Sequence, residues 1–227
     1  MFGIRFVKFE PGVYVFRYKK GKIIQEGEGL SFYFRPAVNS LVGVPVGSAD
    51  APFMFAETSK DFQELTIQGQ LTYRISEPAK TAKMLNYNFD PRALIYISDD
   101  PQKLPDRLIN LALIATKGAI KNLSLKQAIV SADDVAQKVQ AALASDEMVG
   151  ALGVEILSVS IAAIKPNPET AKALEAETRE QILKESDQAI FQRRNYAVEQ
   201  ERIIRESELN TEIAVENKNR EIQEQKM

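Results

Sequence analysis

The last quarter of the chain, from Asn167 to Met227, most limits what this sequence can fold into. Asn167 suits a helix N-cap, Pro168 suits the first helical position, and Glu169 places a negative charge near the positive end of the helix dipole. The rest is rich in Ala, Glu, Gln, Lys and Arg and contains no further Gly or Pro. At about 1.5 Å per residue, this stretch predicts a helix of roughly 90 Å. A polar helix of that length needs partners, because one small domain cannot cover it.

The composition argues against several classes of function. The chain has 227 residues, of which 44% are hydrophobic, so one or two compact domains can precede the helix. A net charge of −2 and a pI near 5.5 argue against a nucleic-acid partner. The chain has no His and no Cys, which excludes Ser-His-Asp and Cys-His catalysis and typical zinc sites within it. We therefore expect neither an enzyme nor a cofactor or metal.

No run approaches the roughly 20 apolar residues of a membrane-spanning helix, and the N-terminus lacks a signal-peptide pattern. The sequence therefore predicts no transmembrane segment in this chain. We expect a location in the cytoplasm or peripherally on a membrane.

The first half of the chain predicts short strands separated by turns, over residues 13–18, 23–24, 30–34, 38–46 and 51–56. The clearest alternation lies in residues 64–76, where the apolar positions are Leu65, Ile67, Leu71, Tyr73 and Ile75. That pattern is typical of an antiparallel strand with one buried face. Gly69 falls on the apolar face and indicates a bulge or a close crossing.

From Glu77 onward, apolar residues recur with the spacing of a helix. We expect a short helix to about residue 86, a core helix over residues 104–121, and a third helix that runs from a capping-box-like start at Ser131 to about Gly150. A strand over residues 154–164 leads into the long helix. The order predicts an α+β fold, in which an antiparallel β-rich head with packed helices precedes a long C-terminal coiled-coil helix.

The apolar stretch at residues 2–9 has two interpretations. It is either a first edge strand or a short interfacial membrane anchor, since Arg5 and Lys8 interrupt it. For the second interpretation, the candidate membrane-contact residues are Phe2, Ile4, Phe6 and Phe9. Eight residues with two cations bind lipid weakly unless an oligomer displays many copies.

Two carboxylate pairs and one Ser-Lys pair are the candidates for chemistry. Asp99-Asp100 and Asp133-Asp134 fit a turn and a helix N-terminus better than a shared site, because adjacent side chains rarely point to one place. Ser59-Lys60 would need a buried lysine and an oxyanion hole to act as a dyad. No enzyme is predicted from these groups.

Apolar residues along the long helix form a sparse stripe. Leu183, Ile190, Ala197 and Ile204 recur every seven residues, while other apolar residues fit less regularly. The stripe favours many parallel helices packed side by side over an isolated dimer, and the alternative is a solvated single helix. The predicted oligomerisation residues are Leu174, Ile182, Leu183, Ile190, Ala197, Ile204 and Ile213.

Several separate stretches resemble the SPFH, or band 7, domain family of stomatin, prohibitin and flotillin. They are Pro11-Gly12-Val13, the turn at residues 18–22, GLSFYFRP at 29–36, TSKDFQELTIQGQLTYRI at 58–75, Glu77-Pro78, GVEILSVSI at 153–161, and the Ala/Glu-rich helix after Pro168. The resemblance covers nearly the whole chain. Many members carry an N-terminal membrane helix or hairpin, and only residues 2–9 stand in that place here.

The resemblance implies a β-rich first SPFH subdomain (1–76), a helical α+β second subdomain (77–166) and a coiled-coil helix (167–227). Because the charged pattern reaches Gln225, Lys226 and Met227 with no helix stop, we expect the chain to be a truncated piece of a longer protein. It also implies a homo-oligomeric scaffold that forms rings or cages, organising a membrane region or enclosing membrane proteins. Membrane lipid and a membrane protease are the expected partners besides a second copy. The alternatives are a subunit of a soluble vault-like particle and an accessory regulator of a membrane protease.

Overall fold

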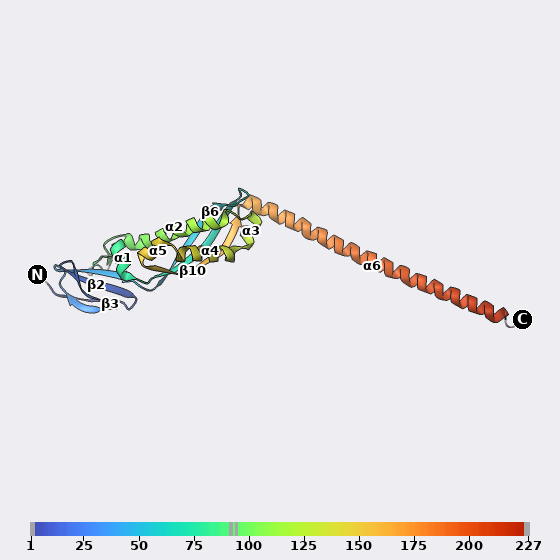
Figure 1. Ribbon diagram of the computed structural model, residues 1–227, viewed down its shortest axis with the longest axis horizontal. Helices are drawn as coiled ribbons and strands as arrows, with labels where there is room; N and C mark the ends of the chain where they lie inside the picture. Colours follow the sequence, from blue (N-terminus) through green and yellow to red (C-terminus); the bar gives the residue numbers. More distant parts are fainter. Residues whose placement is uncertain (1–2, 91–92, 94, 225–227) are drawn as a thin grey trace. The chain divides into compact units, whose positions relative to one another are not determined.

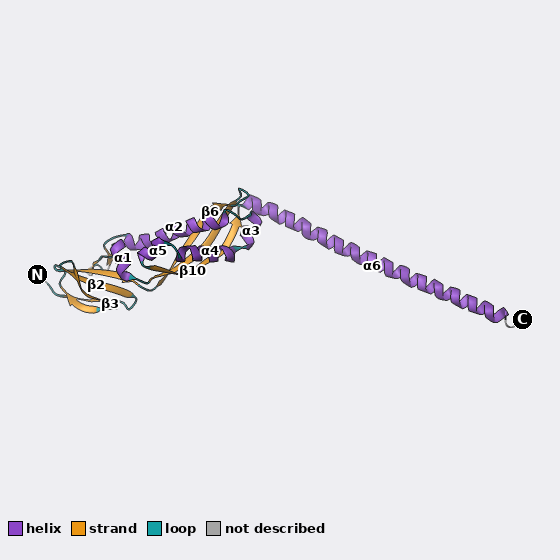
Figure 2. Cartoon of the chain, in the orientation of Figure 1, coloured by secondary structure: helices purple, strands orange, loops and turns teal. Residues whose placement is uncertain are grey.

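The computed structural model describes residues 3–90, 93 and 95–224. Residues 1–167 form one compact unit, and the chain from Pro168 onward forms a second. The predicted α+β class with a long C-terminal helix is confirmed (Figures 1 and 2). The proposed division of the first unit at residue 76 stays a prediction.

The main sheet contains three antiparallel strands, β6 (Ser48–Thr58), β7 (Glu64–Ile75) and β10 (Val154–Pro166), with β7 in the middle. The alternation predicted for β7 is confirmed, because its five apolar positions are buried and their neighbours are more exposed. Gly69 also confirms the predicted close crossing. A Cβ there would lie 2.5 Å from the Phe53 ring and would meet the Ser160 carbonyl oxygen of β10.

Helices cover one face of this sheet (Figure 1). The helix α2 (Asp100–Ile120) packs on β6, and α4 (Ala132–Ala144) packs on β10 and on α2. Leu104, Leu108 and Ala112 of α2 are buried there, as are Val135, Val139 and Leu143 of α4. The apolar layer between this sheet and the two helices is the core of this part of the first unit.

The N-terminal region has a second three-stranded sheet, in the order β3 (Lys22–Glu28), β2 (Val13–Lys19) and β5 (Asn39–Pro45). A two-stranded ribbon of β1 (Arg5–Lys8) and β4 (Ser31–Phe34) packs against it through a shared apolar cluster. A short hairpin, β8 (Phe89–Asp90) and β9 (Ile95–Tyr96), and the helix α1 (Pro78–Met84) adjoin β5. The edge-strand interpretation of the N-terminal stretch is therefore confirmed for Arg5–Lys8.

The helix boundaries depart from expectation in three places. The helix α2 begins at Asp100, four residues early, and the short helix α3 (Leu125–Val130) was not predicted. The capping box expected at Ser131 is wrong, since Ser131 makes no capping bond and the capping box is formed by Ser124 and Gln127 of α3. The third helix does not reach Gly150 but ends at Ala144, because Asp146 caps a separate helix, α5 (Glu147–Leu152).

The second unit is the helix α6, which runs without interruption over Pro168–Glu224. Its length confirms the helix predicted from the absence of Gly and Pro. All side chains of residues 175–219 are exposed on the single chain. Among the described helices, none has a segment long and apolar enough to cross a bilayer.

Candidate interaction surfaces

The β1–β4 ribbon presents two different faces because side chains alternate along each strand. Pairing places Phe6 opposite Tyr33 and Val7 opposite Phe32. Val7 and Phe32 are buried, whereas Phe6 and Tyr33 are 57% and 69% exposed, with ring centroids 5.1 Å apart. The outer face of the ribbon is therefore an exposed aromatic pair on a short, regular scaffold.

Two exposed cations accompany this aromatic pair. Lys8 lies two residues after Phe6 on β1 and Arg35 lies two residues after Tyr33, so both share the outward direction of the pair, whereas Arg5 lies opposite the buried Phe34. Ile4 is also exposed and precedes β1. We call Ile4, Phe6, Lys8, Tyr33 and Arg35 the ribbon surface. Such a combination of apolar and cationic groups fits the interface between lipid headgroups and acyl chains.

The four predicted membrane-contact residues have different positions. Ile4 and Phe6 are on the ribbon surface, and Phe2 lies outside the described residues. Phe9 is only 6% exposed and packs between Phe32 and Phe89, so its side chain belongs to the core. Sequence reasoning missed Tyr33. The alternation in Ser31–Phe34 signals that Tyr33 faces outward, but only the pairing places it beside Phe6.

Six of the exposed large apolar residues of α6 lie in two adjacent lines, while Phe191, Val198, Leu209, Ile213 and Val215 lie outside them. One contains Leu183, Ile190, Ala197 and Ile204, and the other contains Ile182, Ala189, Tyr196 and Ile203. Consecutive residues of a helix lie about 100° apart, so the two lines form one broad face of three heptads. We call these eight residues the double stripe.

Two predicted oligomerisation residues lie away from the double stripe. Nine residues separate Leu174 from Leu183, which at about 100° per residue puts them on opposite sides of the helix. Ile213 is likewise displaced, because Thr211 takes the heptad position after Ile204. Arg202 lies beyond the double stripe and pairs with Glu199 and Glu206 at 2.8 and 2.7 Å. Water and salt screen exposed pairs of this kind, so they stabilise α6 weakly.

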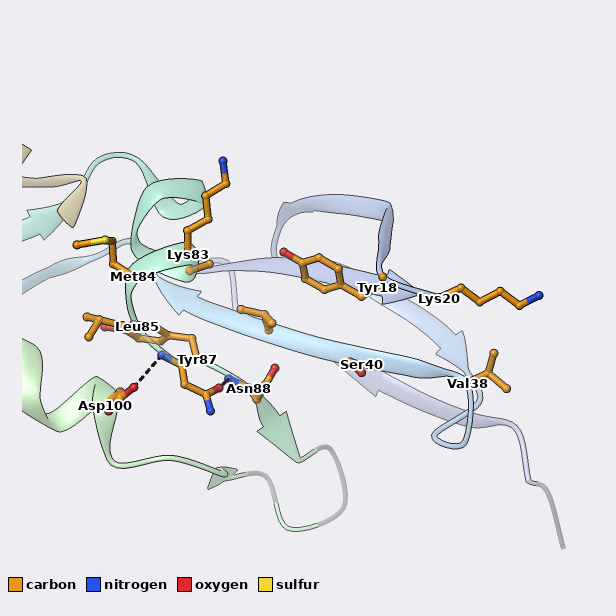
Figure 3. A pocket seen from close by; sticks show the side chains of 14 residues that line it. Tyr18, Lys20, Val38, Ser40, Lys83, Met84, Leu85, Tyr87, Asn88 and Asp100 are labelled. Atoms are coloured by element: carbon orange, nitrogen blue, oxygen red, sulfur yellow. Dashed lines mark hydrogen bonds between the residues drawn. The ribbon is translucent and has the colours of Figure 1, made fainter. Parts of the chain in front are cut away.

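A groove of about 600 Å³ lies between the β2–β5 face and the segment after α1 (Figure 3). Tyr18 and Ser40 line one side, and Tyr87 and Asn88 line the other. The Asn86 backbone N–H donates to Asp100 at 3.0 Å, and burial raises the pKa of Tyr87. Lys20 and Lys83 extend away from the groove, so no cationic centre forms inside it (Figure 3).

The candidates for chemistry have structural roles. Asp99 is the N-cap residue of α2, Asp100 accepts hydrogen bonds from Asn86 and Lys103, and Asp133 and Asp134 lie in the first turn of α4. The Ser59 hydroxyl oxygen accepts a bond from the Gln63 N–H, while Lys60 is exposed. In the part of the chain that the structure describes, no three potential metal-ligating side chains gather.

Comparison with known proteins identifies one family that the chain matches. The sequence profile described as SPFH domain / Band 7 family matches residues 7–204. The matched range contains both three-stranded sheets, the helices α1–α5 and the double stripe of α6. No curated protein sequence matches the chain.

Proposed function

Because the chain belongs to the SPFH domain / Band 7 family, a family of membrane-associated and generally non-enzymatic scaffolds, we propose that it is itself such a scaffold. Many copies associate side by side through α6 into rings or cages. The ribbon surface of each copy rests on a membrane, and the assembled wall organises or encloses membrane proteins. The observation that carries this proposal is the double stripe, exposed on a 57-residue helix.

The double stripe favours two neighbours for each helix. A solitary helix of this length would leave eight apolar positions in water, supported mainly by weak ion pairs within the helix. A two-stranded coiled coil needs one narrow seam, whereas two adjacent heptad lines allow contact with a helix on each side. Repetition of that contact produces a row of parallel helices. The row closes into a ring if the rotations between successive copies add up to a full turn.

The ribbon surface supplies the membrane contact. One exposed aromatic pair with an isoleucine and two cations is a weak anchor by itself. A row of copies presents many such anchors together, and their combined affinity far exceeds that of one. Assembly and membrane binding therefore reinforce each other.

Mass photometry and analytical ultracentrifugation test the assembly. We expect the wild-type chain to form large oligomers and the Leu183→Asp/Ile190→Asp variant to remain monomeric, because two charges interrupt the double stripe. The control is Gln188→Asp/Asn195→Asp, which adds the same charge on another side of α6 and should assemble as the wild type does. A monomeric wild type at high concentration, with residues beyond about 185 cleaved rapidly by protease, would refute the proposal.

Flotation with vesicles that contain anionic phospholipid tests the membrane contact. We expect the assembled wild type to float, and Phe6→Ser/Tyr33→Ser to lose most binding while still assembling. Met54→Ser/Ile114→Ser removes two comparably exposed apolar side chains elsewhere and should float normally. If the assembled wild type stays at the bottom of the gradient, the membrane role is wrong and a particle that functions without a membrane remains.

A further inference from the structure

The groove beside β5 offers apolar contacts and hydrogen-bonding groups side by side. Val38 and Met84 line it with side chains that are 45% and 49% exposed. Tyr18 and Ser40 present hydroxyl groups from the β2–β5 face, and Asn88 presents a carboxamide from the opposite side (Figure 3). In the described part of the chain, these three polar side chains donate and accept no hydrogen bond. They are therefore available to a ligand.

Two lysines stand at the rim of the groove, on different walls. Lys20 belongs to the β2–β3 turn and Lys83 to α1, and both side chains are exposed and extend away from the groove (Figure 3). Positive φ values of 51° and 76° at Lys20 and Gly21 fit a tight two-residue hairpin turn, which fixes where Lys20 leaves the sheet. Lys19 and Lys22 flank this turn. Within the described residues, no ion pair engages Lys20 or Lys83.

Anionic groups do not neutralise this rim. Asp100 is the one acidic residue among the described residues that line the groove, and its carboxylate accepts hydrogen bonds from the Asn86 N–H and from Lys103, at 3.0 and 3.3 Å. Glu26 and Glu28 lie on β3 opposite the first four residues of β2, away from the turn. The two rim lysines therefore favour a ligand with negative charge.

The directions of the lysines favour an extended ligand. Because Lys20 and Lys83 leave the groove from different walls, a compact anion inside it would lie away from both ammonium groups (Figure 3). A peptide that continues past both walls brings carboxylates to both lysines, and its backbone supplies donors and acceptors for the hydroxyl and carboxamide groups between them. An acyl chain would leave those polar groups without partners. The groove thus fits a peptide better than a lipid tail.

We propose that the groove binds an acidic, extended peptide segment of a partner protein. An apolar side chain of the segment lies against Val38 and Met84, and Asp or Glu residues on either side of it pair with Lys20 and Lys83. The site goes beyond the proposed scaffold function, because it gives each copy a place to hold a partner of defined chemistry. Its lining residues all belong to the first unit, so peptide binding does not depend on α6.

Selection from a random peptide library tests the chemistry of the ligand. Ten-residue peptides displayed on phage are selected on the immobilised full chain, and the enriched sequences are synthesised with a fluorescein label for anisotropy. We expect peptides with Asp or Glu on both sides of an apolar residue, and binding that weakens several-fold as the salt concentration rises from about 50 to about 500 mM. No enrichment, or enrichment of basic peptides, would overturn the proposal.

Two variants test whether the selected peptides lie in the groove. Lys20→Glu/Lys83→Glu reverses both rim charges and should weaken binding at least about tenfold. Ser40→Trp fills the groove without changing its charge and should remove most binding. Lys60→Glu/Lys138→Glu makes the same charge change at exposed positions outside the groove and should bind as the wild type does. All replaced side chains are exposed, so circular dichroism should show wild-type thermal midpoints. Undiminished binding by either groove variant would overturn the proposal.

The Leu183→Asp/Ile190→Asp variant separates this inference from the proposed function. It should bind the selected peptides with the same affinity per chain as the wild type. Assembly without peptide binding would overturn the groove site alone, and peptide binding by a wild type that remains monomeric would overturn assembly alone. Flotation with anionic vesicles covers the other class of ligand. If Lys20→Glu/Lys83→Glu no longer floats and no peptide is enriched, the rim lysines contact lipid and the peptide assignment is wrong.

Discussion

At the scale of single residues, Gly153 shows how one backbone position joins the end of α5 to the segment between β7 and α1. It ends α5 with a φ of 69°, and its carbonyl oxygen accepts hydrogen bonds from the N–H groups of both Ser76 and Glu77 at 3.0 Å. A Cβ at this position would lie 2.5 Å from the Glu77 carbonyl oxygen. Only glycine satisfies both the conformation and the space.

We therefore expect Gly153→Ala to lower the free energy of unfolding by about 2–4 kcal/mol. Urea unfolding followed by circular dichroism measures the change. Gly118→Ala is the matched control, since a Cβ there meets nothing within 4 Å inside α2 and should stabilise the helix by about 0.5–1 kcal/mol. Equal unfolding midpoints for Gly153→Ala and the wild type would contradict the expected clash.

Asp100 ties the start of α2 to the segment after α1. The hydrogen bond from the Asn86 N–H, reinforced by Lys103, holds the pKa of the Asp100 carboxyl below its ordinary value. A carboxyl group with a depressed folded-state pKa stabilises the fold above its unfolded pKa, and this contribution is lost as the pH falls through the folded-state pKa. The segment after α1, which lines the groove, should therefore be held less stably in acid.

Asp100→Asn should lower the thermal midpoint at pH 7, and the difference from the wild type should disappear in acid below the depressed pKa. Thermal unfolding of both proteins across that pH range measures the effect. Asp106→Asn lies on the exposed side of the same helix, where the described structure shows no bond to its side chain, and should change little at either pH. A pH-independent effect of Asp100→Asn would contradict the role of the charged carboxylate.

At the scale of elements, the capping of α3 distinguishes two serines with similar sequence surroundings. The Ser124 hydroxyl accepts from the Gln127 N–H at 3.4 Å, and the Gln127 side chain accepts from the Ser124 N–H at 3.1 Å. The Ser131 hydroxyl instead donates to the Gln127 carbonyl oxygen at 2.6 Å. Ser131 therefore closes the end of α3 and leaves the start of α4 without a side-chain cap.

We expect Ser124→Ala to lower the free energy of unfolding by about 1 kcal/mol and Ser131→Ala by less than about 0.5 kcal/mol. Chemical denaturation of the two variants side by side provides the measurement. A larger loss for Ser131→Ala than for Ser124→Ala would show that the cap is at Ser131, as the sequence alone suggested.

At the scale of the whole molecule, the head carries its own core. Every buried hydrophobic side chain in the described residues falls between Val7 and Ile164. The helix α6 therefore contributes no buried apolar group to the folding of a single chain, and its apolar face remains available to other copies.

A chain that ends at residue 167 should thus fold with nearly the thermal midpoint of the dissociated full chain, and it should no longer form large oligomers. Calorimetry and mass photometry of the shortened protein measure the two properties. A large fall in the midpoint would mean that α6 stabilises the head directly.

Local interactions explain which features were predictable from the sequence. The hydrogen bonds of α6 run from residue i to i−4, so composition and the absence of Gly and Pro suffice to predict it. The alternation in β7 likewise reports its buried face directly. The break between α4 and α5 was missed, because capping at Asp146 competes with an otherwise continuous helical pattern.

The candidate surfaces were likewise predictable from the sequence only in part. The sequence by itself determined the long helix, most of its apolar stripe and the apolar character of the N-terminal strand, since these depend on spacing along one element. Only the tertiary structure decided that Phe9 packs in the core, that Tyr33 lies beside Phe6, and that Phe62 is exposed in the loop between β6 and β7. Those placements depend on strand pairing and loop contacts between residues far apart in the chain, and no local period encodes them.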